Sequence, residues 1–395
     1  MPPRPTVLEI FLVALRLGCT SFGGPVAHLA FFRKEYVEKR RWLDEAHYAD
    51  LVALCQFLPG PASSQTGFGI GYIHRGFAGG LAAWLGFTLP SAVLMIGFAY
   101  GVSFLGELAS AGWLLGLKAA AVAVVAQAVL AMWRNLCPDL SRSALAAGSA
   151  GLLLVLPFAW SQIGVIALGA LIGRLFLKAP ASVAVRSLSS NGENLRKAWL
   201  CLGVFLVLLL GLPVLAGLTA HPALDVLDRF YRAGSLVFGG GHVVLPLLER
   251  EVVAPGWVTH DQFLAGYGVA QAVPGPLFSF SAYLGAVGTH GAGGWAGGLW
   301  SLFAIFLPAL LLVAGALPLW QTLRTRADMQ AAMRGANAAV VGVLLAALIT
   351  PVMATGLTSK PAVALAVGVF AMLEWARWPA WAGVAAAALA GLWLL

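Results

Sequence analysis

Long apolar stretches alternate with short polar segments along the whole chain. Residues 81–104 carry no charged side chain, and residues 112–133 and 198–218 carry at most one each. About 18 consecutive apolar residues are enough for a helix to cross the hydrocarbon layer of a membrane. Two shorter apolar stretches follow residue 133 and end near Arg174. The pattern predicts an all-α polytopic membrane protein.

Groups of glycine and proline interrupt two apolar stretches in the first half of the chain, at Gly23-Gly24-Pro25 and at Pro59-Gly60-Pro61. Proline removes a backbone donor and glycine permits dihedral angles that other residues resist, so a helix must break at each group. We therefore expect residues 7–41 to form a broken hairpin that enters and leaves on one side of the membrane. The second group is expected to lie in a similar re-entrant hairpin, because broken backbone at membrane depth persists only inside protein or beside a water-filled cavity.

The order of landmarks in the first half recurs in the second half. In chain order, the landmarks and their copies are Arg16 and Arg232, Gly23-Gly24-Pro25 and Gly239-Gly240-Gly241, Trp42 and Trp257, and Pro59-Gly60-Pro61 and Pro274-Gly275-Pro276. Each landmark is separated from its copy by almost the same stretch of sequence, which indicates a duplication. We expect a first transmembrane repeat over residues 1–177, a linker with an extra transmembrane helix over 178–222, and a second transmembrane repeat over 223–395.

Matching loops of the two halves carry opposite charges. Residues 33–41 hold five basic residues, whereas the matching segment of the second half holds Glu249, Arg250 and Glu251. The loop near Glu107 is acidic, and its counterpart is basic at Arg324 and Arg326. Cytoplasmic loops favour lysine and arginine. With four crossings in each repeat and one unpaired helix between them, the chain is expected to form two inverted repeats, with residues 33–41 in the cytoplasm.

Composition excludes a soluble fold. Hydrophobic residues make up 60% of the chain and charged residues 10%, against about 45–50% and about 25% in soluble proteins. The net charge of +8 does not indicate nucleic acid, because the basic residues lie between apolar stretches rather than in one aromatic-flanked stripe. The four cysteines show no C-x-x-C spacing, so we expect no metal site, and no cofactor is indicated. No nucleotide-binding motif is present, so transport energy must come from a gradient.

Paired helix breaks in two repeats indicate a substrate site where the repeats meet. Helix N-termini carry partial positive charge and free N–H groups, which suit a tetrahedral oxyanion. We expect the four breaks to converge near the bilayer midplane around one cavity. The candidates beyond the turn residues are the hydroxyls of Ser63, Ser64, Ser279 and Ser281 and the amides of Gln56 and Gln271. The alternative is that the breaks are ordinary kinks in closely packed helices.

Arg16 lies inside an apolar stretch, where a charge is costly unless it is paired or functional. Its guanidinium offers a planar set of donors that fits an oxyanion better than lysine does, and Arg232 repeats it. The alternatives for Arg16 are an ion pair with Glu9 or a reach to the lipid headgroups. Lys118 and Arg334 begin matching helices and are interpreted as residues that reach the membrane surface.

Four titratable residues flank the glycine turns. They are His28, Glu35, His242 and Glu249. Histidine titrates near neutral pH, so these residues are candidates for proton coupling. The alternative is that they are simply solvated at the membrane surface.

The landmarks Ser21-Phe22-Gly23-Gly24-Pro25, Trp42 and Gln56-x-x-Pro59-Gly60-Pro61, with their second copies, resemble the chromate ion transporter family in its long, two-domain form. The resemblance spans almost the whole chain. It implies a multi-pass carrier in the cell membrane that exports chromate and so gives chromate resistance. The resemblance also implies that proton or anion exchange drives this export. It assigns the family motif directly to Gly23, Gly24, Pro25, Gln56, Pro59, Gly60 and Pro61. The second half departs from the motif, because Gly241 stands where the first half has Pro25.

Other functions stay open at this point. Uptake or exchange of sulfate or another divalent oxyanion would use the same donors. A membrane-embedded enzyme would need a redox cofactor site or a paired acid and base, which the apolar stretches do not offer, so no catalytic residue is expected. A channel is disfavoured, because inverted repeats with central breaks are typical of alternating access. The expected partners are a chromate- or sulfate-like oxyanion and the lipid bilayer, with a homodimer left open.

Overall fold

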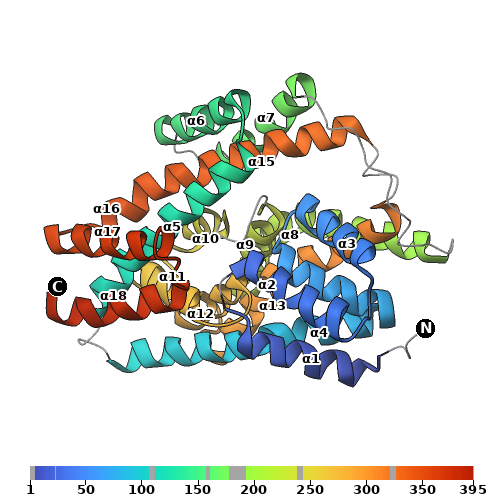
Figure 1. Cartoon of the computed structure of the whole chain (residues 1–395), viewed down its shortest axis with the longest axis horizontal. Coiled ribbons are helices and arrows are strands. Elements are labelled where there is room, and N and C mark those ends of the chain that lie inside the picture. The colour runs from blue at the N-terminus through green and yellow to red at the C-terminus, as the bar shows by residue number, and fades with distance from the viewer. Residues whose placement is uncertain are drawn as a thin grey trace.

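The computed structural model describes residues 5–22, 24–105, 112–156, 161–177, 193–237, 243–320 and 326–394, and it contains helices but no strand over these residues (Figure 1). The first-half helices are α1 (Val7–Thr20), α2 (Gly24–Phe32), the π-helix η1 (Arg33–Lys39), α3 (Glu45–Phe57), α4 (Ala62–Leu105), α5 (Gly112–Leu136), α6 (Leu140–Val155) and α7 (Ser161–Phe176). The linker helix is α8 (Glu193–Thr219). The second-half helices are α9 (Pro222–Ser235), α10 (Val244–Val252), α11 (His260–Ala272), η4 (Leu277–Ser279), α12 (Phe280–Val287), α13 (Gly294–Ala316), η5 (Leu317–Leu319), α15 (Ala327–Ala347), η6 (Leu348–Met353), α16 (Ala354–Gly356), α17 (Lys360–Glu374) and α18 (Ala380–Leu394).

Five helical stretches within the described residues are long and apolar enough to span a membrane: Ala62–Gly101, Gly112–Leu136, Leu195–Thr219, Gly294–Leu319 and Ala327–Gly356. The prediction of an all-α polytopic membrane protein built from two inverted repeats with broken helices is thereby confirmed. On α8, Val207, Leu210 and Leu218 are exposed, as expected for a helix that faces lipid.

The predicted helix breaks are present. The helical path stops at Thr20 and resumes at Gly24, and it stops again at Phe57 and resumes at Ala62. In the second half it stops at Ser235 and at Ala272. Gly23, the turn Gly239-Gly240-Gly241 and His242 lie outside the described residues, as does Arg324.

Repeat-related side chains cap the N-termini of α3 in the first half and α11 in the second. Asp44 accepts a hydrogen bond from the His47 amide at the start of α3, at 2.8 Å. Thr259 caps α11 in a reciprocal arrangement with Gln262. Side chains of these types satisfy amides that have no acceptor within their own helix. These capping residues therefore determine where α3 and α11 begin.

Within each repeat the first helix packs closely on a long one, α1 on α4 and α9 on α13. Repeat-related glycines allow this contact. A Cβ atom on Gly18 would lie 2.6 Å from the Phe87 carbonyl oxygen, and one on Gly234 would overlap the backbone of Ile305. Small residues of this kind let helix backbones approach each other in a membrane.

The two repeats also exchange their last helices. The first repeat's α6 and α7 pack on α15 of the second repeat, and the second repeat's α17 and α18 pack on α5 of the first (Figure 1). Glycines again form the contacts, because a Cβ atom on Gly335 would overlap Gly169 and one on Gly116 would overlap Ala387. Neither half therefore buries its own long helix without the other.

This exchange gives a stability prediction. Replacing Gly335 with leucine should force α15 away from α7 and destabilise the protein by about 1–3 kcal/mol, the usual cost of overpacking. Gly148→Leu on α6 is the matched control, because nothing lies within 4 Å of a Cβ atom there. Thermal unfolding of both variants in detergent, followed by size-exclusion chromatography, measures the difference. Equal melting temperatures for the two variants would contradict the assigned contact.

Candidate functional site

Two backbone hydrogen bonds join the turns of one repeat to those of the other. The Gly60 amide donates to the Val237 carbonyl oxygen at 2.6 Å, and the Gly275 amide donates to the Ser21 carbonyl oxygen at 3.0 Å. Gly60 and Gly275 are repeat-related, and so are Ser21 and Val237. Each Pro-Gly-Pro turn thus binds the segment that precedes the glycine turn of the other repeat. The structure thus brings each Pro-Gly-Pro turn into contact with the other repeat, and we name this region the central crossing. Convergence of all four breaks around one cavity at the bilayer midplane stays a prediction, since Gly239-Gly240-Gly241 lies outside the described residues.

Both turns require glycine for two reasons. Gly60 and Gly275 adopt φ angles of +124° and +100°, which side chains other than hydrogen resist. Both also face packed atoms. A Cβ atom would lie 2.9 Å from the Ala309 Cβ atom at Gly60, and 2.9 Å from the Ser91 Oγ atom at Gly275. The central crossing is therefore tightly packed around its backbone.

Buried polar side chains collect on the first-repeat side of the central crossing. The His28 Nδ1 atom lies 3.3 Å from the Ser63 Oγ atom, and the Gln65 side-chain Nε2 atom donates to the Pro59 carbonyl oxygen at 2.8 Å. Buried polar atoms here that make no hydrogen bond in the structure belong to Ser21, His28, Ser64, Gln65 and Thr88. Since buried polar groups in proteins are nearly always hydrogen-bonded, this concentration suits a polar ligand. Helix α4 also begins at Ala62, and its first amides have no acceptor within the helix.

The second-repeat side differs. Ser279 is the repeat counterpart of Ser64, but its hydroxyl donates to the Pro276 carbonyl oxygen at 2.7 Å. Ser281 likewise donates to the Phe278 carbonyl oxygen at 2.8 Å. Gln56 is exposed, whereas Gln271 is half-buried and its side-chain Nε2 atom is buried. The central crossing is symmetric in its backbone and asymmetric in its side chains.

A repeated ion pair flanks the central crossing. Arg16 pairs with Glu35, and Arg232 pairs with Glu251 at 3.2 Å. The spacing from Arg16 to Glu35 along the chain is the same as the spacing from Arg232 to Glu251, so the second pair is the repeat copy of the first. The expected alternative pairing of Arg16 with Glu9 is wrong, because Glu9 pairs with Arg40 at 2.8 Å.

Sequence reasoning missed Glu251. We singled out Glu249 beside the second glycine turn, yet the residue that matches Glu35 and pairs with Arg232 is Glu251. The nearly constant offset between the two copies was the signal that could have found it. Glu249 has a different contact, since its carboxylate lies 3.1 Å from the His260 Nδ1 atom.

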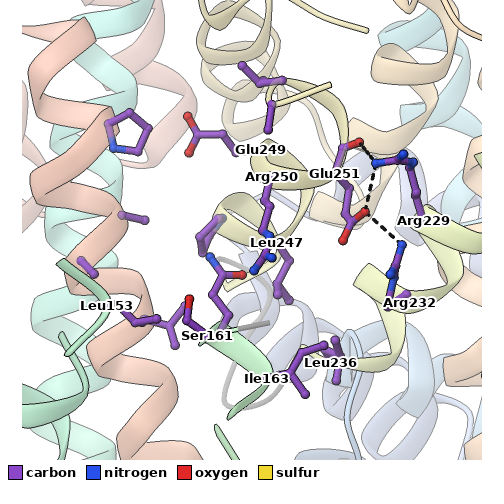
Figure 2. Close-up of a pocket in the computed structure, with 18 of the residues that line it drawn as sticks. Leu153, Ser161, Ile163, Arg229, Arg232, Leu236, Leu247, Glu249, Arg250 and Glu251 are labelled. Carbon is purple, nitrogen blue, oxygen red and sulfur yellow. Dashed lines mark hydrogen bonds and ion pairs between the residues drawn. The ribbon is translucent and has the colours of Figure 1, made fainter. Parts of the chain in front are cut away.

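Two cavities contain these ion pairs. The Arg232 cavity, of about 990 Å³, lies between α9, α10, α15, the end of α6 and the start of α7. The Arg16 cavity, of about 550 Å³, lies between α1, α2 and η1. Figure 2 shows Arg229 and Arg232 pointing toward Glu251 in the larger cavity.

The two cavities are copies of one feature. Residues of the Arg16 cavity whose repeat counterparts line the Arg232 cavity are Arg16, Thr20, Phe31, Lys34, Glu35, Glu38 and Lys39. The duplication has therefore produced one cavity for each repeat. Since the repeats are inverted, we expect the two cavities to face opposite sides of the membrane.

Lys118, interpreted as a residue that reaches the membrane surface, makes an ion pair that the sequence did not predict. Its side chain is buried and its Nζ atom lies 2.6 Å from an Asp261 carboxylate oxygen. A buried lysine with a carboxylate partner ties α5 of the first repeat to α11 of the second.

Comparison with known proteins points to one family. The sequence model of the family described as "Chromate transporter" matches residues 8–174 and again residues 224–392. The chromate transport protein of Pseudomonas aeruginosa is 28% identical over 78% of this chain and 72% of its own length. The chromate transport protein of Cupriavidus metallidurans is 28% identical over 88% of this chain and 83% of its own length. The probable chromate transport protein of Synechococcus elongatus is 26% identical over 88% and 85%. No solved structure matches the chain.

The asymmetry of the central crossing gives a prediction for a repeat-related pair of serines. Ser279→Ala should lower the free energy of unfolding by about 1 kcal/mol, because it removes a buried hydrogen bond. Ser64→Ala should leave it unchanged or raise it, because the lost hydroxyl makes no hydrogen bond. Thermal unfolding in detergent without added anions compares the two. An equal loss in both variants would show that the Ser64 hydroxyl has a partner.

Proposed function

The chain belongs to the chromate transporter family, and on that premise we propose that it exports chromate from the cytoplasm across the cell membrane, driven by proton exchange. The family match over both repeats and the five candidate spans make the chain a multi-pass membrane transporter rather than an enzyme. The observation that carries the proposal is the central crossing, where both Pro-Gly-Pro turns meet the opposite repeat.

The central crossing is the proposed oxyanion site. A tetrahedral dianion accepts hydrogen bonds on all sides, and the buried Ser21 and Ser64 hydroxyls and the first amides of α4 are donors. Gly24 and Pro25, which start α2, and Pro59 and Pro61 place these donors. The two equivalent backbone hydrogen bonds offer a means of alternating access. Breaking either bond would open the same site to a different side of the membrane.

The direction of transport is proposed from the charges of the two cavities. The Arg16 cavity is lined by three basic and two acidic side chains, whereas the Arg232 cavity is lined by three arginines and four carboxylates. The five basic residues of segment 33–41, which lines the Arg16 cavity, support a cytoplasmic position for that cavity. A positively charged cavity concentrates anions, so chromate would load from the cytoplasm and leave through the less attractive cavity.

The coupling site is proposed at Glu249 and His260. Their 3.1 Å contact lines the Arg232 cavity, which gives a proton access to both side chains. Glu35 is a poorer candidate, because it contacts Arg16, Lys39 and Arg40, and protonation would weaken all three ion pairs. His28 is buried beside Ser63, away from either cavity lining. Exchange for another anion is the alternative form of coupling.

Chromate flux in proteoliposomes tests the proposed function. Wild-type protein should accumulate radiolabelled chromate, and sulfate in excess should compete if the site accepts tetrahedral dianions in general. Ser64→Ala should raise the KM for chromate about tenfold, the loss expected for one hydrogen bond to a charged group. Ser143→Ala, whose hydroxyl donates to the Cys137 carbonyl oxygen far along the chain, is the control. The proposal fails if wild-type protein carries no chromate, or carries sulfate alone.

Glu249→Gln tests the coupling. The amide cannot exchange a proton, so a pH gradient should no longer drive chromate accumulation, while exchange of internal for external chromate at equal pH continues. Glu374→Gln is the matched control, because Glu374 is a mostly buried glutamate paired with Arg134 outside both cavities. An unchanged response of Glu249→Gln to the pH gradient would remove Glu249 from the coupling step.

A further inference from the structure

Among the residues that the structure describes, each cavity contains one basic side chain that forms neither an ion pair nor a side-chain hydrogen bond. In the Arg232 cavity, Arg229 pairs with Asp225 at 2.9 Å and Arg232 pairs with Asp228 at 2.9 Å. Arg250 also lines this cavity, and within the described ranges it has neither an ion pair nor a side-chain hydrogen bond. Its guanidinium is attracted by Glu251 through space but makes no direct contact with a carboxylate of the cavity lining.

The Arg16 cavity repeats this arrangement. Arg16 pairs with Glu35, and Lys39 approaches the same carboxylate at 3.8 Å. Lys34 also lines the cavity and has no ion pair or side-chain hydrogen bond within the described part of the chain. Lys34 directly precedes Glu35, and Arg250 directly precedes Glu251, so the two basic residues are repeat counterparts. Two copies have thus kept a basic side chain without a direct ion pair at the same place.

The positions of the neighbouring carboxylates leave Arg250 accessible. Figure 2 shows Glu249 and Glu251 directed to opposite sides of α10, with Arg250 extending into the cavity between them. Arg250 is half-buried, so its charge has lost part of its hydration, and Glu251 attracts it only through space, without a direct ion pair. Removing a charge from water is costly unless it is paired, and an incoming anion would supply the missing pair.

We propose that Lys34 and Arg250 are docking residues for a tetrahedral dianion in two repeat-related vestibules, one on each face of the membrane. Each takes the anion from solution and holds it before it enters, or after it leaves, the central crossing. The assignment rests on the proposed transport of chromate. Arg16 and Arg232 fit this step less well, because their charges are already neutralised by carboxylates.

The two vestibules differ in strength. Carboxylates outnumber arginines in the Arg232 cavity, so Arg250 binds the dianion against neighbouring negative charge. Lys34 acts in a cavity where basic side chains outnumber acidic ones. Lys34 therefore binds the dianion more strongly, where the anion is loaded, and Arg250 binds it more weakly, where the anion is released.

Vesicles of defined sidedness test the assignment. In inside-out vesicles, which present the cytoplasmic face, Lys34→Gln should raise the KM for chromate about tenfold with little change in kcat. Arg250→Gln should leave that KM unchanged and raise the KM in right-side-out vesicles. Lys34→Arg and Arg250→Lys keep the charge and should retain most of the affinity, which separates loss of docking from loss of fold. Lys360→Gln and Arg377→Gln are matched controls, since both residues are exposed and line neither cavity.

Binding to the solubilised protein gives a second readout that does not depend on flux. Chromate should raise the melting temperature of the wild-type protein, and Lys34→Gln should require about tenfold more chromate for the same rise. Wild-type flux together with unchanged KM values in both glutamine variants and both vesicle types overturns the docking assignment alone. An equal chromate dependence of melting in wild type and Lys34→Gln also overturns it. Absence of wild-type chromate flux, by contrast, overturns the proposed function.

Discussion

The structure depends on two backbone hydrogen bonds that cross between the repeats, from Gly60 to Val237 and from Gly275 to Ser21. A backbone group among membrane-spanning helices must find a partner inside the protein, because lipid offers none. Each repeat breaks its helices at the turns and so frees such groups, and the other repeat supplies the acceptor. The breaks, the glycines at positive φ and the packing of α1 on α4 and α9 on α13 all serve this arrangement.

Much of the fold follows from the sequence, because its determinants are local. Proline and glycine at residues 59–61 and 274–276 stop a helix whatever surrounds them, and apolar length identifies the membrane spans. The exchange of α7 and α18 between the repeats could not be predicted. Its determinants, such as Gly169 and Gly335, are ordinary small residues in apolar helices until the helices are placed side by side.

The candidate site was predictable in its backbone and less so in its side chains. The turns themselves follow from the repeated motif, but the burial of Lys118 depends on Asp261, an aspartate of the other repeat that lies far away in the sequence. The pairing of Arg16 was also missed. The alternative partner Glu9 was chosen by spacing within one helix, since both residues lie on α1, whereas Glu35 lies on a different helix, η1, and reaches Arg16 only when the two helices are packed together.

The exchange of last helices constrains when the first repeat can complete its packing during synthesis. As the first repeat leaves the ribosome, its α5 and α7 carry glycine faces whose partners, α18 and α15, have not been synthesised. The early half must wait in the membrane in an unfinished state until those later helices have been added. Removal of α18 alone would therefore uncover a helix of the opposite repeat, so the first half is completed only by the last helix of the second.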